Sequence, residues 1–261
     1  MSARVSFAEH WRQRPRAARP ACSSRLVEVR GVVLVHGAWH GAWCWERVMA
    51  GLLTAGVRDV AAVELPLTGL DDDVAAARAA VGSVAGASGE AVVLVGHSYG
   101  GIVVTNAGGA PDVAHLVFVA ALVPDLGESG LSVGAGSPST VLGESIVSGD
   151  DGAWITVRPD RATAAFYADC EKGVAEAAVA RLRPQPTSSL VAETTVAAWR
   201  RTPSTYILCE HDEAVHPVLQ ERMATRAGGE VVRLASGHSP FLSQPETVVE
   251  IITALCAAPR A

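Results

Sequence analysis

A serine lies between glycines in the pentapeptide Gly96-His97-Ser98-Tyr99-Gly100. The run Val92–Val95 before it is unbroken and rich in β-branched residues, which is typical of a buried strand, and the residues from 102 to 107 favour a helix. A tight strand-to-helix turn exposes a serine hydroxyl, and the start of the helix stabilises negative charge that develops beside it. The pattern predicts Ser98 as an activated nucleophile rather than an incidental serine in a glycine-rich turn.

A serine hydroxyl needs a neighbouring base, and that base needs a carboxylate to orient it. Among the eight histidines, His238 lies in a loop between the last candidate strand and a helix, so it is the predicted base. Asp212 follows the strand predicted at 206–209 by a few residues and is favoured as the acid over the two glutamates beside it. Asp125, which also follows a strand, is the alternative acid.

Acyl transfer also needs hydrogen-bond donors for the oxyanion of the tetrahedral intermediate. We expect the backbone N–H groups of Tyr99 and Ala38 to supply them, with Gly37 allowing its loop to fold toward Ser98. Aromatic and neighbouring side chains are candidates for a substrate pocket, although ordinary core packing explains each aromatic residue equally well. These candidates are His36, Gly37, Trp39, Trp154, Phe166, Tyr167 and Trp199.

No metal or cofactor is expected from the sequence. His36 and His40 have i, i+4 spacing, but no glutamate of the zinc-protease pattern stands between them and no third ligand is evident. The glycines from 96 to 101 lack the lysine of a phosphate-binding loop. The five cysteines are widely spaced without a CxxC pair, which favours free thiols and a cytoplasmic protein. Cys44 and Cys209 lie among apolar residues, so we expect them to be buried.

Composition predicts one globular domain over residues 31–261, because 261 residues of which 49% are hydrophobic can bury one large core. The net charge is −6, yet residues 1–30 are rich in arginine and proline, which favours a basic, disordered extension. The acidic remainder argues against nucleic-acid binding, and no apolar run is long enough to span a membrane. The expected partner is a small-molecule ester, while the oligomeric state is open, a homodimer included.

The order of the elements predicts the fold class. Short apolar runs at 32–35, 92–95 and 116–119 are typical of buried parallel strands, and 60–65, 206–209 and 231–234 are weaker strand candidates. Helical stretches lie between them at 43–55, 73–85, 100–109, 218–227 and 245–257. Strands that alternate with helices indicate an α/β fold with a mostly parallel, doubly wound sheet.

The interval from about 124 to 190 interrupts this alternation. It begins with a Gly/Ser-rich stretch at 127–152 and continues with one helical pattern from Ala162 to Leu182, which Arg183-Pro184 ends. An insertion after a core strand lies over the carboxyl ends of the sheet, where open α/β folds bind ligands. We therefore expect a helical cap, with an ordinary loop and surface helix as the alternative.

Three segments resemble one branch of the α/β-hydrolase superfamily. They are VLVHGAWHGAWCW at 33–45, CEHDE at 209–213 and SGHSPFLS at 236–243. The branch holds bacterial carboxylesterases such as the pyrethroid-hydrolysing esterases, plant methylesterases and plant hydroxynitrile lyases. The resemblance implies an α/β-hydrolase fold with a cap, a triad of Ser98, Asp212 and His238, and no cofactor.

The same resemblance separates two activities. The lyases of this branch carry threonine where Gly37 stands and lysine where Ser239 stands, and the positive charge of that lysine stabilises departing cyanide. Ser98 is followed by Tyr99, as in the bacterial esterases. We therefore expect a serine hydrolase that cleaves esters of small, largely hydrophobic substrates through an acyl-enzyme. A thioesterase, cyclase or lyase of secondary metabolism is the alternative, and an intact triad argues against a mere ligand receptor.

Overall fold

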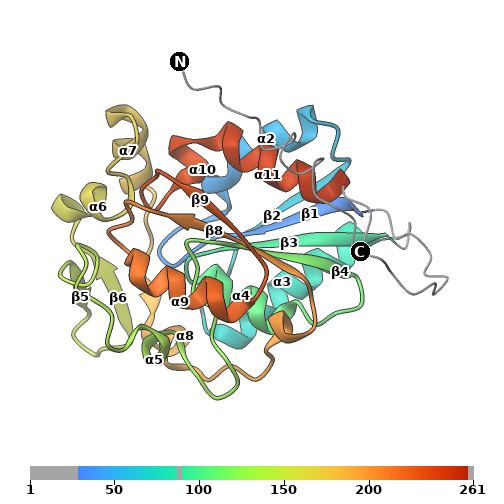
Figure 1. Cartoon of the computed structure of the whole chain (residues 1–261). Helices are drawn as coiled ribbons and strands as arrows, with labels where there is room; N and C mark the ends of the chain where they lie inside the picture. Colours follow the sequence, from blue (N-terminus) through green and yellow to red (C-terminus); the bar gives the residue numbers. More distant parts are fainter. Residues whose placement is uncertain (1–28, 87–89, 258–261) are drawn as a thin grey trace.

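The computed structural model describes residues 29–86 and 90–257, and it has a six-stranded sheet at its centre (Figure 1). The strand order is β2-β1-β3-β4-β8-β9, and every neighbouring pair is parallel. The strands are β1 (Val29–Val35), β2 (Asp59–Val63), β3 (Ala91–His97), β4 (Val113–Val119), β8 (Ser204–Cys209) and β9 (Glu230–Leu234). All six predicted strands are confirmed. Residues 1–28 of the predicted basic extension lie outside the described residues.

Helices cover both faces of the sheet, which confirms the doubly wound prediction. Side chains alternate along β1, so that Val33 and Val35 face one core while Val32 and Leu34 face the other. The first core is covered by α3 (Leu70–Ala85), α4 (Gly100–Ala107) and α9 (Pro217–Ala227). The second is covered by η1 (Ala42–Trp45), α2 (Glu46–Thr54), α10 (Pro240–Ser243) and α11 (Pro245–Ala257) (Figure 1). None of the described helices is long and apolar enough to cross a bilayer.

The strand order fixes where a ligand site belongs. From β1 the chain moves to β2 at one edge, whereas from β3 it moves through β4 and β8 toward the other edge. The crevice at the carboxyl ends of β1 and β3 is therefore the switch point at which open α/β sheets bind ligands. The loop that carries His36 follows β1, and Ser98 follows β3.

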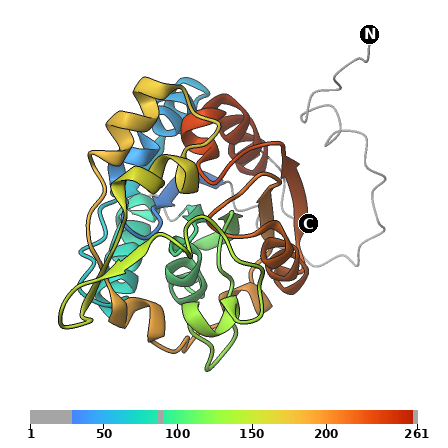
Figure 2. The ribbon, with the colours of Figure 1, turned by 90° about the vertical axis from the view of Figure 1, so that its left-hand side faces the viewer.

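The chain between β4 and β8 forms a cap beside this end of the sheet (Figures 1 and 2). A small antiparallel sheet of three strands, β5-β6-β7, lies within it. The cap elements are α5 (Gly130–Gly134), β5 (Ile146–Ser148), β6 (Trp154–Val157), α6 (Pro159–Phe166), α7 (Lys172–Val179), β7 (Gln185–Pro186) and α8 (Thr187–Val191), and η2 (Ala198–Arg200) follows them. In Figure 2 the cap faces the viewer in front of the sheet.

The prediction of a single helix from Ala162 to Leu182 is wrong, because the segment folds as α6 and α7 with a break between them. Tyr167 leaves the helical region at φ −134°. Its hydroxyl contacts His40 at 2.8 Å, and the Asp169 carboxylate accepts a hydrogen bond from Gly237 N–H at 2.8 Å. Side chains at the break thus contact distant parts of the chain.

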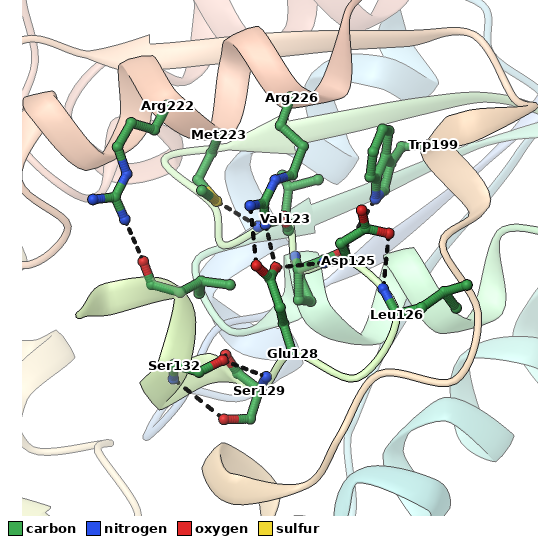
Figure 3. Close-up of polar contacts among 12 residues, drawn as sticks. Val123, Asp125, Leu126, Glu128, Ser129, Ser132, Trp199, Arg222, Met223 and Arg226 are labelled. Atoms are coloured by element: carbon green, nitrogen blue, oxygen red, sulfur yellow. Dashed lines mark hydrogen bonds and ion pairs between the residues drawn. The ribbon is translucent and has the colours of Figure 1, made fainter. Parts of the chain in front are cut away.

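Helix α9 holds the beginning of the cap (Figure 3). Arg226 donates to the carbonyl of Val123 at 3.0 Å and forms a bidentate pair with Glu128. One turn earlier, Arg222 donates to the carbonyl of Val133 in α5 at 2.6 Å. Bidentate arginine–carboxylate pairs fix geometry better than single contacts, so the entry of the cap is attached firmly to the body.

Candidate active site

Ser98 occupies a strained turn between β3 and α4. Its φ is +52°, a left-handed conformation that non-glycine residues rarely adopt. A Cβ atom at Gly96 would lie 2.5 Å from Gly100 O, and one at Gly100 would lie 2.7 Å from His36 O. Both glycines are therefore required for the close backbone approach, and the Ser98 N–H donates to Val119 O at 3.1 Å. Strain that the surrounding structure holds in place is a frequent property of functional residues.

His238 and Asp212 form a buried pair beside this turn. His238 Nδ1 lies 2.7 Å from Asp212 Oδ2, and each residue is 2% exposed. The other carboxylate oxygen, Asp212 Oδ1, accepts hydrogen bonds from the N–H groups of Ala214 and Val215 at 2.7 and 2.9 Å. Because Nδ1 donates to the carboxylate, the neutral imidazole presents an unprotonated Nε2, the form that a general base requires.

Gln220 is a further member of this group that the sequence patterns leave unmarked. Its side chain is fully buried in α9, and Nε2 donates to Asp212 Oδ2 at 2.8 Å and to Val215 O at 2.8 Å. Oε1 accepts from Cys209 N–H at 2.9 Å. The one available signal is a polar residue on the apolar face of a helix that follows the acid. Gln220 therefore fixes the carboxylate oxygen that contacts His238.

His97 joins the serine turn to the histidine loop. Its Nε2 lies 3.0 Å from the carbonyl oxygen of His238, and the centroids of the two rings are 4.5 Å apart. Burial lowers the pKa of His97 well below its usual value, so the ring is neutral and its Nε2–H donates. Gly37 approaches from the other side, where a Cβ would lie 2.8 Å from His97 Nδ1 and 3.0 Å from Ser98 Cβ.

The loop after β1 is held by its own histidines. The carbonyl of Gly37 accepts from His36 Nδ1 at 2.8 Å, and His36 Nε2 accepts from Leu65 N–H at 3.1 Å. Burial lowers the pKa of His36 to about 4, so this ring is neutral. The Gly37 carbonyl and the Ala38 N–H belong to one planar peptide group. His36 therefore orients the N–H group that the sequence predicts as an oxyanion donor, and both of its ring nitrogens are engaged within the protein.

Two of the predicted pocket aromatics lie in one row with His238. The ring centroids of Trp39 and Phe166 are 5.8 Å apart, and those of Phe166 and His238 are also 5.8 Å apart. Phe166 belongs to the cap, so the cap supplies an apolar surface against the candidate base. Tyr167, the next residue, directs its hydroxyl at His40.

The two remaining aromatics lie elsewhere. Trp154 in β6 is 42% exposed and lines a cavity of about 600 Å³ with Leu67, Thr68 and Arg183. Trp199 donates from Nε1 to the carbonyl of Pro124 at 3.0 Å, where the chain leaves the sheet for the cap (Figure 3). The structure therefore places Trp39 and Phe166 in a row with His238 and Tyr167 against His40, whereas Trp154 and Trp199 have other surroundings.

Asp125, the alternative acid, has another partner. Its Oδ2 lies 2.6 Å from the Arg200 guanidinium, and its Oδ1 accepts from Leu126 N–H. Slight burial raises the pKa of Asp125, but the hydrogen bond and charge of Arg200 outweigh that effect and leave the pKa below its usual value. Figure 3 shows the carboxylate among cap-entry residues. Its geometry suits an ion pair, whereas Asp212 contacts a histidine.

The histidines and cysteines of the described residues do not gather around a metal position. No group of three or more His, Cys, Asp or Glu side chains with suitable geometry occurs within residues 29–86 and 90–257. Both His40 nitrogens are engaged, Nδ1 with Ala38 O and Nε2 with Tyr167, each at 2.8 Å. Cys44 and Cys209 are free and fully buried, which confirms their expected placement, and burial raises both thiol pKa values.

Comparisons with known proteins agree with this architecture. A sequence model of the Alpha/beta hydrolase family matches residues 32–251. The alpha/beta hydrolase nvfD of Aspergillus novofumigatus (strain IBT 16806) is 32% identical over 240 residues, covering 85% of this chain and 94% of that protein. Esterase PIR7B of Oryza sativa subsp. japonica is 44% identical over 108 residues, which are 37% of this chain and 40% of the esterase.

A solved structure shares the fold over almost its whole length. The pyrethroid hydrolase from Sphingobium faniae JZ-2 superposes with a TM-score of 0.75 at 24% identity, covering 88% of this chain and 98% of that structure. The resemblance seen in the sequence motifs is thus confirmed by the family match and by the capped parallel sheet. The chain belongs to the α/β hydrolase family.

Proposed function

We propose that the protein is a serine carboxylesterase with a triad of Ser98, His238 and Asp212. The observation that carries the proposal is the buried pair of His238 and Asp212, 2.7 Å apart and fixed by further donors, beside a serine at φ +52°. A serine in this conformation after a parallel strand presents its hydroxyl at the carboxyl end of the sheet. The relatives that are esterases support hydrolysis of carboxylic esters.

The chemistry follows from these roles. Ser98 Oγ attacks the ester carbonyl while His238 Nε2 removes the hydroxyl proton, and Asp212 stabilises the imidazolium that forms. The N–H groups of Tyr99 and Ala38 donate to the oxyanion of the tetrahedral intermediate. His238 then gives its proton to the departing alcohol. Water, activated by the same histidine, hydrolyses the acyl-enzyme and restores the serine.

The surroundings favour esters with small, largely hydrophobic groups. Trp39 and Phe166 form an apolar row that reaches His238, and a ligand in contact with them would be shielded from water. Within the described residues the site has no group of metal ligands, and none is needed for this reaction sequence. The esterase relatives support an ester as the substrate.

Two positions argue against cyanohydrin cleavage by this α/β-hydrolase fold. A threonine in place of Gly37 would bring its Cβ to 2.8 Å from His97 Nδ1 and 3.0 Å from Ser98 Cβ. Ser239 is fully buried, so a lysine there would carry its charge out of water, which is costly without a partner. These contacts favour the hydrolase over a lyase.

The test is esterase activity with the serine removed. Wild type should release p-nitrophenol from p-nitrophenyl acetate and butyrate, whereas Ser98→Ala should not. A fluorophosphonate should add its mass once to wild type, at Ser98, and not to the variant. Turnover that survives in Ser98→Ala, or a wild type that neither turns over nor is labelled, would refute the proposal.

A further inference from the structure

A chain of two hydrogen bonds runs from the cap into the loop after β1. Tyr167 Oη lies 2.8 Å from His40 Nε2, and His40 Nδ1 lies 2.8 Å from the carbonyl oxygen of Ala38. Tyr167, His40 and Ala38 are 0%, 1% and 4% exposed. The link therefore lies out of water, where an unmade hydrogen bond is costly.

The direction of each bond follows from the chemistry of its atoms. A carbonyl oxygen can only accept, so His40 Nδ1 carries the hydrogen that reaches Ala38. Burial lowers the pKa of His40 to about 3, which keeps the ring neutral and leaves Nε2 without a hydrogen. Burial also raises the pKa of Tyr167 well above its usual value, so the phenol keeps its proton. Tyr167 is the donor, and His40 transmits its position to Ala38.

The cap holds the rest of this loop as well. Trp39 N–H faces Gln185 Oε1 at 3.4 Å, and Trp39 Nε1 donates to Ile155 O at 3.1 Å. Arg183 donates to His40 O through Nε and Nη2, at 3.1 and 2.8 Å. Trp39 has φ +62°, a conformation that a tryptophan keeps only where its surroundings hold it. Contacts from the cap therefore determine the shape of residues 38–40.

We propose that Tyr167 is a positioning residue for the oxyanion hole, acting through His40 on Ala38. This inference rests on the proposed function, in which Ala38 N–H stabilises the oxyanion. The Ala38 carbonyl that His40 contacts and the Ala38 N–H that donates to the oxyanion lie on either side of one α-carbon. A change in a backbone torsion of Ala38 therefore moves the N–H donor. The cap thereby contributes to the rate of the chemical step and not only to the choice of substrate.

Tyr167→Phe tests this link because it removes one oxygen atom and keeps the ring. Loss of a complete oxyanion donor costs about 10²–10³-fold in kcat, and a misplaced donor should cost less, so we expect a fall in kcat of roughly tenfold. KM should stay within about twofold, since the ground-state ester barely uses this donor. Affinity for a phenylboronic acid, whose serine adduct places an oxygen in the oxyanion hole, should fall in parallel with kcat.

Tyr206→Phe is the matched control. Tyr206 is 1% exposed and donates to the carbonyl of Ala121 at 2.8 Å, so the control removes a comparable buried hydrogen bond without touching residues 38–40. Thermal melts of both variants show whether each folds. Equal losses of kcat in the two variants, or a Tyr167→Phe variant that changes KM alone, would overturn the inference.

A second variant approaches the same link from its other end. In His40→Asn the amide N–H can still donate to Ala38 O, but the shorter side chain does not reach Tyr167. We expect its kcat to fall as in Tyr167→Phe, and the double variant to show no further fall, because both changes break one connection. Additive losses would refute the link. Failure of the proposed function is a different outcome, namely a wild type without turnover or labelling at Ser98.

Discussion

Replacing Gln220 with leucine should move the pH dependence of ester hydrolysis to higher pH. Gln220 Nε2 donates to Asp212 Oδ2, the same oxygen that contacts His238 Nδ1. Without that donor, more of the negative charge on this oxygen acts on the imidazole. A stronger negative field stabilises the protonated ring relative to the neutral ring that acts as the base. The basic form would then predominate only at higher pH, so the acid limb of kcat/KM should shift upward.

General hydrogen-bond energies give the expected size of this shift. A hydrogen bond to a charged group contributes about 1.5–3 kcal/mol, and one pKa unit corresponds to about 1.4 kcal/mol. Asp212 keeps the donors Ala214 and Val215 on its other oxygen, so only part of the lost interaction reaches His238. If about a third to a half does so, the acid limb rises by roughly 0.5–1 pH unit.

The assay is kcat/KM for p-nitrophenyl butyrate from pH 5 to pH 9, with thermal melts at each pH. Gln185→Leu is the control, because Gln185 is also fully buried while its amide oxygen faces Trp39 N–H. The control should lose stability without moving the acid limb. An unmoved midpoint in Gln220→Leu, a downward shift, or an equal shift in the control would refute the reasoning.

Three further outcomes are expected. Asp212→Asn should lower kcat by about 10⁴-fold, while Asp125→Asn should stay within about twofold because exposed ion pairs contribute little; the reverse ranking in p-nitrophenyl butyrate kinetics would move the acid. Gly37→Ala should abolish turnover, since its Cβ would lie 3.0 Å from Ser98 Cβ, and wild-type rates would contradict that packing. Burial lowers the pKa of His40 to about 3, against about 6.5 in the unfolded chain. Between about pH 6.5 and pH 3 the unfolded chain therefore binds this proton and the folded protein does not, so the free energy of unfolding falls as the pH decreases. At pH 5 the loss from this one residue is about 2 kcal/mol. Urea unfolding at pH 7 and pH 5 should show a loss in His40→Asn that is smaller than the wild-type loss by this amount, because the buried His36 and His97 add the same kind of loss to both proteins.

The parts of the fold that sequence reasoning predicts are those with a local signal. Unbroken apolar runs rich in β-branched residues mark β1, β3 and β4, because strands covered on both faces need apolar side chains at every position. The turn around Ser98 is equally local, since Gly96 and Gly100 are required by contacts within that turn and to the neighbouring strand. Asp212 and His238 follow from chain order, and the structure places the two side chains 2.7 Å apart.

The features that sequence reasoning does not predict depend on tertiary side-chain contacts. At the break between α6 and α7, Tyr167 contacts His40, 127 positions away, and Asp169 contacts Gly237, 68 positions away. Neither partner alters the helical period of residues 162–182. Gln220 is hidden for a similar reason, because a helix pattern distinguishes buried from exposed positions but does not indicate which buried amide contacts a carboxylate. In both cases the missing information is the hydrogen-bond partner of a side chain, which a local pattern does not report.

These distant contacts assign the cap two roles in one short segment. Phe166 packs 5.8 Å from the His238 ring, Tyr167 positions His40, and Asp169 accepts from Gly237 N–H directly before the histidine. Three cap residues within four positions thus contact the base loop and the oxyanion loop. A cap that opened as a rigid lid would break these hydrogen bonds, and the loops that carry His238 and Ala38 would lose the positions that catalysis needs. We therefore expect substrate to enter beside this segment, and changes at these cap positions to alter kcat together with specificity.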